Sequence, residues 1–303
     1  MRIVFMGTPF FAKVALEALL KTKEFEIVGL FTQIDKPFGR KKELKMPETK
    51  AYLIENHFNI PIFQPEKLGI EEIDILKNLK PDFIVVVAYG KLLPKGVLEI
   101  APCINLHASL LPKYRGASPI HEMLLNDDEI YGISTMLMDL EMDSGDILET
   151  FSFKRKRYLD LETLSLELAY KGAELLIHTL KNFTSITPKT QEHALATFCK
   201  KITKNDGLVT FKDAKNLFLK SLAFKSWPQV FLESGLKLLE IELIEEIKAH
   251  VEGEILNISE QGVIIGCLKG SVKIARLQAV GKQPLKAKDY LNGKRLKMGD
   301  KLA

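Results

Sequence analysis

An Asn-x-His pair near the end of a short apolar segment is the part of this sequence best suited to chemistry. Residues 103–107 are apolar enough to form a buried β-strand. Because side chains alternate along a strand, Asn105 and His107 then share one face. An amide beside a titratable imidazole can polarise a carbonyl group and move a proton at one place. Taken alone, such a pair is more often a polar strand end, with Asn105 capping a turn and His107 buried and hydrogen-bonded.

The segments before this pair alternate between strand-like and helix-like patterns. This rhythm predicts a doubly wound α/β fold with a mainly parallel sheet. Ligands of such sheets bind beyond the carboxyl ends of the strands, where Asn105 and His107 lie. The predicted strands are 2–6, 26–32 and 83–88, and the predicted helices are 11–21, 48–57 and 70–79.

An acidic turn over 139–146 lies between two further predicted strands, 133–138 and 147–153. A carboxylate from this turn that came close to His107 would orient the ring and stabilise its charged form. A long amphipathic helix over 161–182 follows, and Asp160 can cap it.

The second part of the chain has a different pattern of apolar and polar residues. We predict one domain over 1–183, a linker over 184–205 and a second domain over 206–303. An amphipathic helix over 214–225 and short alternating runs indicate a small β-barrel, of the OB-like type. The predicted strands of this barrel are 230–233, 237–244, 253–259, 262–267 and 271–277.

Composition and cysteine content exclude several classes of protein. The chain has 303 residues, of which 46% are hydrophobic and 27% charged, as in ordinary soluble globular proteins. Its 3 cysteines follow no CxxC spacing, so neither a disulfide framework nor a zinc site is expected, and a reducing cytoplasm is the natural location. No apolar run reaches the roughly 18 residues of a membrane-spanning helix. Pro9 interrupts the apolar N-terminus, which argues against a signal peptide.

Positive charge gathers in the second part. Residues 200–303 contain 19 basic and 12 acidic side chains, whereas residues 1–199 contain 24 and 27. This asymmetry indicates either a polyanionic partner or a lysine-rich solubilising surface. The segment 34–47 adds five basic residues around Pro37 and Gly39. It is either a solvated loop or one that orders against phosphates.

Five separated motifs occur in order along the chain, over 6–9, 85–90, 105–112, 114–120 and 138–146. Together they resemble the bacterial methionyl-tRNA formyltransferase family, whose members are folate-dependent. The resemblance spans nearly the whole chain, including Asp206-Gly207 at the start of the second domain. It implies a Rossmann-like formyltransferase domain followed by a tRNA-binding β-barrel domain.

The resemblance also implies the reaction and its residues. A formyl group would pass from 10-formyltetrahydrofolate to the α-amino group of initiator methionyl-tRNA, by direct amine attack through a tetrahedral intermediate. Asn105, His107 and Asp143 match the catalytic trio, although Asp139 and Asp146 remain alternative carboxylates in the same turn. The enzyme is expected to be a cytoplasmic monomer that needs no metal. The folate-contacting positions would be Ser109, Leu110, Leu111 and Pro112, and those engaging the tRNA acceptor end Arg40, Lys41 and Lys42.

Other functions remain open at this stage. A formyltransferase acting on a nucleotide-linked amino sugar or on glycinamide ribonucleotide would keep the same trio, but the basic second domain fits tRNA better. An NAD-dependent oxidoreductase would need a G-x-G-x-x-G fingerprint, and Gly7 is followed by no such glycines. A non-enzymatic RNA-binding protein would leave Asn105 and His107 without a role.

Overall fold

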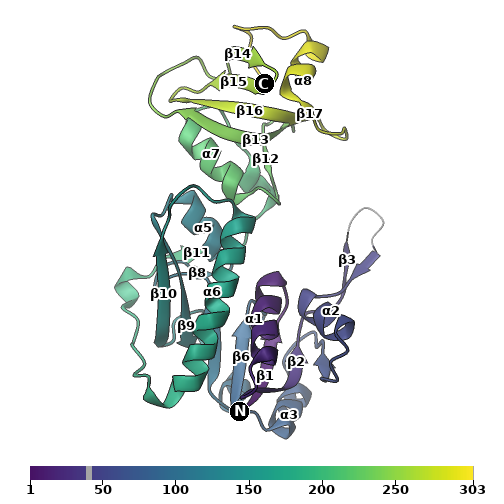
Figure 1. Ribbon diagram of the computed structural model, residues 1–303, viewed down its shortest axis with the longest axis vertical. Helices are drawn as coiled ribbons and strands as arrows, with labels where there is room; N and C mark the ends of the chain where they lie inside the picture. Colours follow the sequence, from purple (N-terminus) through teal and green to yellow (C-terminus); the bar gives the residue numbers. More distant parts are fainter. Residues whose placement is uncertain (39–42, 303) are drawn as a thin grey trace. The chain divides into compact units, whose positions relative to one another are not determined.

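The computed structural model describes residues 1–38 and 43–302, and the chain folds as two compact units (Figure 1). The N-terminal unit comprises Met1–Pro119, Glu129–Arg155 and Ser165–Lys200. The C-terminal unit comprises Ile120–Asp128, Lys156–Leu164 and Lys201–Ala303.

A seven-stranded sheet forms the centre of the N-terminal unit. Its strands from β7 to β5 pair in parallel, and β9 and β10 extend it in antiparallel fashion. The prediction of a mainly parallel α/β domain followed by a separate β domain is therefore confirmed. The strands in order across the sheet are β10 (Ile147–Lys154), β9 (Ile130–Leu137), β7 (Cys103–His107), β6 (Phe83–Val87), β1 (Arg2–Gly7), β2 (Glu26–Phe31) and β5 (Ile62–Phe63).

Helices cover both faces of this sheet because its central strands are apolar on both sides. Val14 of α1 packs against Ala169 and Ala173 of α6 on one face. Leu76 of α3 and Val97 of α4 belong to the core cluster on the other face. The helices in this part of the chain are α1 (Phe10–Lys21), α2 (Glu48–Glu55), α3 (Ile70–Leu79), α4 (Lys95–Leu98), α5 (Pro119–Leu125) and α6 (Leu161–Asn182).

Two local predictions for these elements are confirmed. Helix α3 has the predicted bounds, and α6 begins directly after Asp160. The Asp160 carboxylate accepts a hydrogen bond from the Thr163 N–H at 2.8 Å, as a capping residue does.

Close packing explains the glycine of the first motif. A Cβ on Gly7 would lie 2.7 Å from the Ala12 Cβ and 2.9 Å from the Val87 carbonyl oxygen. Only glycine allows α1 to start so close to β6.

Part of the predicted loop 34–47 is a β-hairpin. Strands β3 (Lys36–Phe38) and β4 (Glu43–Lys45) pair antiparallel. Asp35, just before β3, is fixed by the Lys50 ammonium at 2.8 Å and by the Gln64 amide at 2.8 Å. The hairpin is not apparent from the sequence because its strands lack alternation and β4 is exposed. Arg40, Lys41 and Lys42 lie outside the described residues.

The C-terminal unit is built on an antiparallel sheet in the order β12-β13-β16-β15-β14, with β17 paired to β16. Neither β17 nor α8 was predicted. Strand β17 has two exposed residues, and only Ala287 and Leu291 of α8 are buried, too few to give an apolar period. The elements are α7 (Ala214–Ala223), β12 (Val230–Phe231), β13 (Lys237–Glu245), β14 (Ile255–Ser259), β15 (Gly262–Gly266), β16 (Ser271–Gln278), β17 (Leu285–Lys286) and α8 (Ala287–Lys294).

Over the described ranges 1–38 and 43–302, no helix is long and apolar enough to cross a membrane. Five further short elements occur in the described residues. They are β8 (Arg115–Gly116), η1 (Phe183–Ser185), η2 (His193–Leu195), β11 (Phe198–Cys199) and η3 (Lys204–Gly207).

Two buried thiols are expected to make the fold sensitive to alkaline pH. Burial raises the pKa of Cys103 to about 12 and that of Cys267 to about 12, whereas an unfolded cysteine has a pKa of about 8.5. The stabilisation is complete below pH ~8.5 and is lost as pH rises towards 12, because only the unfolded chain releases the proton in that window. Each thiol should lower the free energy of unfolding by about 1.4 kcal/mol per pH unit there.

Urea unfolding followed by circular dichroism between pH 8 and 11 would measure this dependence. Cys103→Ala should lose stability less steeply with pH than the parent protein. Equal slopes would contradict the assignment to Cys103.

Candidate functional site

Strand β7 places the Asn-x-His pair in the sheet next to its most buried strands. Asn105 lies opposite Val86 of β6 and Met136 of β9, and His107 lies opposite Ser134 of β9. The two side chains are 8% and 5% exposed. They therefore stand at the carboxyl end of a parallel strand, with little surface open to solvent.

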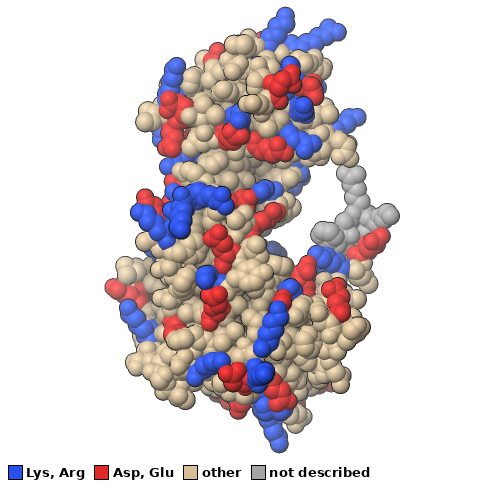
Figure 2. All heavy atoms as spheres, in the orientation of Figure 1, with Lys and Arg blue, Asp and Glu red and all other residues tan. Residues whose placement is uncertain are grey.

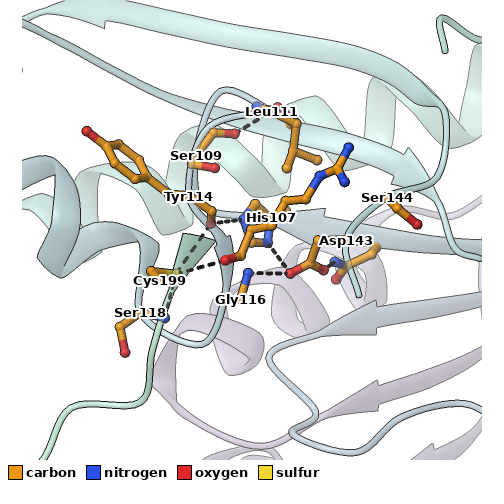
Figure 3. A network of polar contacts seen from close by, with 12 residues as sticks. His107, Ser109, Leu111, Tyr114, Gly116, Ser118, Asp143, Ser144 and Cys199 are labelled. Atoms are coloured by element: carbon orange, nitrogen blue, oxygen red, sulfur yellow. Dashed lines mark hydrogen bonds and ion pairs between the residues drawn. The ribbon is translucent and has the colours of Figure 1, made fainter. Parts of the chain in front are cut away.

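The turn between β9 and β10 brings one of its three candidate carboxylates to this pair. Asn105 Nδ2 donates to Asp143 Oδ1 at 3.3 Å, and Asp143 Oδ2 lies 3.6 Å from His107 Nδ1. In Figure 3 the Asp143 carboxylate points toward the His107 ring, whereas Ser144 points away. Asp139 instead accepts a hydrogen bond from the Leu140 N–H at 2.7 Å. The structure thus brings Asn105, His107 and Asp143 together.

A second contact fixes the same Asp143 oxygen that faces His107. The Gly116 N–H donates to Asp143 Oδ2 at 2.8 Å (Figure 3). Gly116 has a φ of +118°, and a Cβ on it would lie 2.3 Å from the Cys199 carbonyl oxygen. Asp143 itself has a φ of +51°, in the left-handed region that non-glycine residues rarely adopt. Such strained backbone persists only where its surroundings hold it, as they do here.

The His107 ring has a defined orientation. Its Nε2 lies 2.9 Å from the Tyr114 carbonyl oxygen, which can only accept, so Nε2 carries a proton. Nδ1 is then the nitrogen that can accept a proton, and the Asp143 carboxylate faces it.

The Asn105 amide keeps one donor available. One of its two N–H groups is directed at Asp143. In the part of the chain that the structure describes, the other N–H has no hydrogen-bond partner. Asn105 can therefore donate to an oxygen that enters the site beside His107.

The predicted folate-contacting segment follows β7 directly, and a buried serine holds it in place. Ser134 Oγ accepts from the Leu111 N–H at 3.1 Å and donates to the Ser109 carbonyl oxygen at 2.7 Å. The Ser109 hydroxyl is fully buried and donates to the Lys113 carbonyl oxygen at 2.5 Å. Leu110 and Pro112 retain partly exposed surface. These two side chains, rather than the Ser109 hydroxyl, are open to a ligand.

Several residues around this site come from the segment 184–205, which was predicted only as a linker. Strand β11 pairs in parallel with β8 and sets Cys199 opposite Gly116. The Ser118 N–H donates to Cys199 Sγ at 3.2 Å (Figure 3). Gln191 and Arg115 form a buried hydrogen-bonded group beside the Asp143 turn. These contacts join residues at least 48 positions apart, and no periodic pattern marks them in the sequence.

In residues 1–38 and 43–302, no group of three or more His, Cys, Asp and Glu side chains is arranged to hold a metal ion. The chemistry that the described groups offer is hydrogen bonding to an oxygen by Asn105 and proton transfer at His107, with Asp143 facing both.

Comparisons with known proteins find similar sequences along the whole chain. The family model described as formyl transferase matches residues 1–180, and that described as formyl transferase, C-terminal domain, matches residues 201–295. The methionyl-tRNA formyltransferase of Helicobacter pylori (strain ATCC 700392 / 26695) is 75% identical over 303 residues, which is 100% of both chains. That of Campylobacter jejuni subsp. doylei is 51% identical, with 99% of each chain covered.

A solved structure shares the fold at low sequence identity. It is the N-formyltransferase from Helicobacter canadensis in complex with folinic acid and dTDP-3-aminofucose. The identity is 18% and the TM-score is 0.67, with 91% of this chain and 99% of that chain covered.

Proposed function

Because the chain belongs to the methionyl-tRNA formyltransferase family, we propose that Asn105, His107 and Asp143 catalyse formylation of initiator methionyl-tRNA. The formyl donor is a formyl-tetrahydrofolate, which we assign as the 10-formyl compound. This compound supplies the formyl group. The residues of the site bind and orient the substrates and move a proton. Like its relatives, the chain is an enzyme of translation initiation. We assign it to the cytoplasm as a monomer that needs no metal.

The available Asn105 N–H is the observation that best supports this proposal. When the amino group of the methionyl ester adds to a formyl carbonyl, negative charge develops on the carbonyl oxygen. A fixed amide donor at that position stabilises the charge without reorganising during the reaction. Because Asn105 sits on a central strand and is bonded to Asp143, its second N–H has a fixed direction.

His107 and Asp143 handle the proton that the amine must lose. The Tyr114 carbonyl occupies Nε2–H, which leaves Nδ1 to accept the proton. The Asp143 carboxylate, 3.6 Å from Nδ1, stabilises the resulting imidazolium. Gly116 holds the carboxylate in that direction through its N–H. In this proposal Asn105 binds the developing oxyanion, and His107 accepts the proton with the help of Asp143.

The segment 109–112 fits a folate co-substrate through shape rather than through the Ser109 hydroxyl. Its backbone is tied to Ser134, and Leu110 and Pro112 offer apolar surface to a flat ring. A rigid, partly apolar segment next to catalytic groups is typical of small-molecule sites.

The C-terminal unit offers basic side chains for the tRNA backbone. Lys273, Arg276 and Lys288 pair with glutamates of the same unit. Other basic side chains between 282 and 301 are exposed and, within the described residues, form no ion pair. Figure 2 shows Lys and Arg side chains projecting from this unit. The unpaired residues are Lys282, Lys286, Lys294, Arg295, Lys297 and Lys301.

Removing unpaired charges should weaken tRNA binding more than removing paired ones. In Lys294→Ala/Lys297→Ala, each lost phosphate contact should reduce the slope of log affinity against log salt by about 0.7–0.9. Filter binding of methionyl-tRNA from about 50 to 200 mM salt would measure the slope. The control Lys273→Ala/Lys288→Ala changes the net charge equally but removes side chains already paired with glutamates. An equal loss in both proteins would attribute binding to net charge alone and contradict the assignment.

A substrate comparison tests the function as a whole. Formyl transfer from 10-formyltetrahydrofolate would be measured to initiator methionyl-tRNA, uncharged tRNA, free methionine, a nucleotide-linked amino sugar and glycinamide ribonucleotide. Product with methionyl-tRNA alone is expected. Product only with a small amine would keep the proposed trio and overturn the tRNA assignment.

The basic residues Arg40, Lys41 and Lys42 are proposed to engage the acceptor end of the tRNA. Their support is the family pattern, because they lie outside the described residues. Arg40→Ala is expected to weaken productive engagement of tRNA, and an unchanged response to tRNA concentration would remove this assignment.

A further inference from the structure

Gln191 is a buried side chain whose full hydrogen-bonding capacity is used beside the proposed catalytic trio. It is 3% exposed. Its Oε1 accepts from Arg115 Nε at 3.1 Å and from Arg115 Nη2 at 2.7 Å. Its Nε2 donates to the carbonyl oxygens of Asp143 at 2.9 Å and Gly145 at 2.7 Å. A glutamine amide has two acceptor sites and two donors, so all four are occupied.

These partners fix the orientation of the amide. The arginine can only donate, and the two backbone carbonyls can only accept. A reversed amide would set N–H against N–H and oxygen against oxygen at four contacts. No side chain other than an amide of this length satisfies both sides at once. The arrangement therefore depends on the residue type as well as on its volume.

Asp143 is consequently held at two points by the same dipeptide. Its carboxylate accepts from the Gly116 N–H directly. Its carbonyl oxygen is joined through Gln191 to the side chain of Arg115. Arg115 is in turn fixed by the residue just before strand β11, because its N–H donates to the Thr197 carbonyl oxygen at 2.8 Å. A closed ring of covalent and hydrogen bonds thus restrains both the backbone and the side chain of Asp143.

We propose that Gln191 is a positioning residue for formyl transfer, which acts on the reaction through Asp143. By binding the carbonyls on both sides of Ser144, it holds Asp143 at its φ of +51° and aims the carboxylate at Asn105 and His107. This inference rests on the proposed function, because it assumes that Asp143 serves catalysis. It assigns to the segment 184–205 a part in the active site, beyond that of joining two domains.

Gln191→Glu keeps the hydrogen bonds that Gln191 accepts and removes those that it donates. A glutamate keeps the volume and the oxygen that accepts from Arg115, but it cannot donate to the Asp143 and Gly145 carbonyls. Its second oxygen repels them and releases the turn. A misplacement of about 1 Å can lower a rate by about a hundredfold, so we expect kcat to fall between about tenfold and a hundredfold. KM for both substrates should stay within about twofold, because no substrate contact is removed.

Two further variants exclude other causes of such a loss. Asn182→Asp makes the same amide-to-acid change at an exposed amide that also donates to a backbone carbonyl, that of His178 at 2.9 Å, and should keep full activity. Gln191→Asn keeps the amide chemistry without adding charge but is too short to reach both partners. It should reproduce the loss, and it replaces Gln191→Glu in every comparison if that variant does not fold.

A double-mutant cycle with Asp143→Ala gives the deciding readout. If Gln191 acts through Asp143, Gln191→Glu should change kcat less than about twofold in the Asp143→Ala background, because coupled residues are not additive. A residue with a merely structural role would lower kcat by the same factor in both backgrounds, which would overturn the inference. Full activity of Gln191→Asn would also overturn it. Full activity of Asp143→Ala alone would instead overturn the proposed function of the trio.

Discussion

Asn105→Ala is expected to lower kcat for formylation of methionyl-tRNA by about 10²–10³-fold, the usual effect of removing one donor to a developing oxyanion. The side chain is 8% exposed, it donates one N–H to Asp143, and its other N–H is available to the formyl oxygen. Because the interaction forms mainly as charge develops, the dissociation constant of the folate should change little. Single-turnover formylation and equilibrium folate binding would measure the two quantities separately.

Two comparisons make this prediction specific. Asn105→Asp keeps the shape but replaces the donors with a second carboxylate beside Asp143, so it should lose at least as much activity as the alanine variant. Asn56→Ala, which removes an exposed amide bonded to the Tyr52 carbonyl at 2.9 Å, should leave kcat unchanged. Near-normal turnover of Asn105→Ala would show that another group stabilises the oxygen.

His107→Ala is expected to lower kcat by about 10²–10⁴-fold, the range typical of a positioned general base. The ring is 5% exposed and its Nδ1, the proposed acceptor of the departing proton, lies 3.6 Å from Asp143 Oδ2. The loss should appear in the rate of the chemical step and not in tRNA affinity. Rapid-quench measurement with saturating folate and tRNA would report that step.

His107→Gln distinguishes proton transfer from local structure. A glutamine can still donate to the Tyr114 carbonyl, which His107 Nε2 contacts at 2.9 Å, but it cannot accept a proton. It should therefore be as inactive as His107→Ala and closer to the parent in thermal stability. His178→Ala, at a histidine that is 63% exposed and paired with Glu149, serves as the control with normal activity. Recovery of activity in His107→Gln would assign His107 a hydrogen-bonding role in place of proton transfer.

The order of elements and the shared face of Asn105 and His107 could be predicted because both depend on local pattern. Helix α3 and the long helix α6 have the predicted ranges, since their apolar positions repeat at the helical period. The pair on β7 follows from strand alternation alone. Polar or exposed elements could not be predicted for the same reason. Strand β4 of the hairpin and helix α8 bury too few apolar side chains to give a periodic pattern.

The sequence alone determined the alternating fold, the basic second part and, through several separated motifs, the family and its reaction. Only the tertiary structure decided which carboxylate of the 139–146 turn faces His107, because that depends on the left-handed backbone at Asp143 and on the Gly116 N–H. It also decided that the Ser109 hydroxyl is turned inward and that Gln191 joins the Asp143 turn to Arg115. Such contacts are set by the packing of segments distant in sequence, which leaves no local periodicity for a single sequence to display.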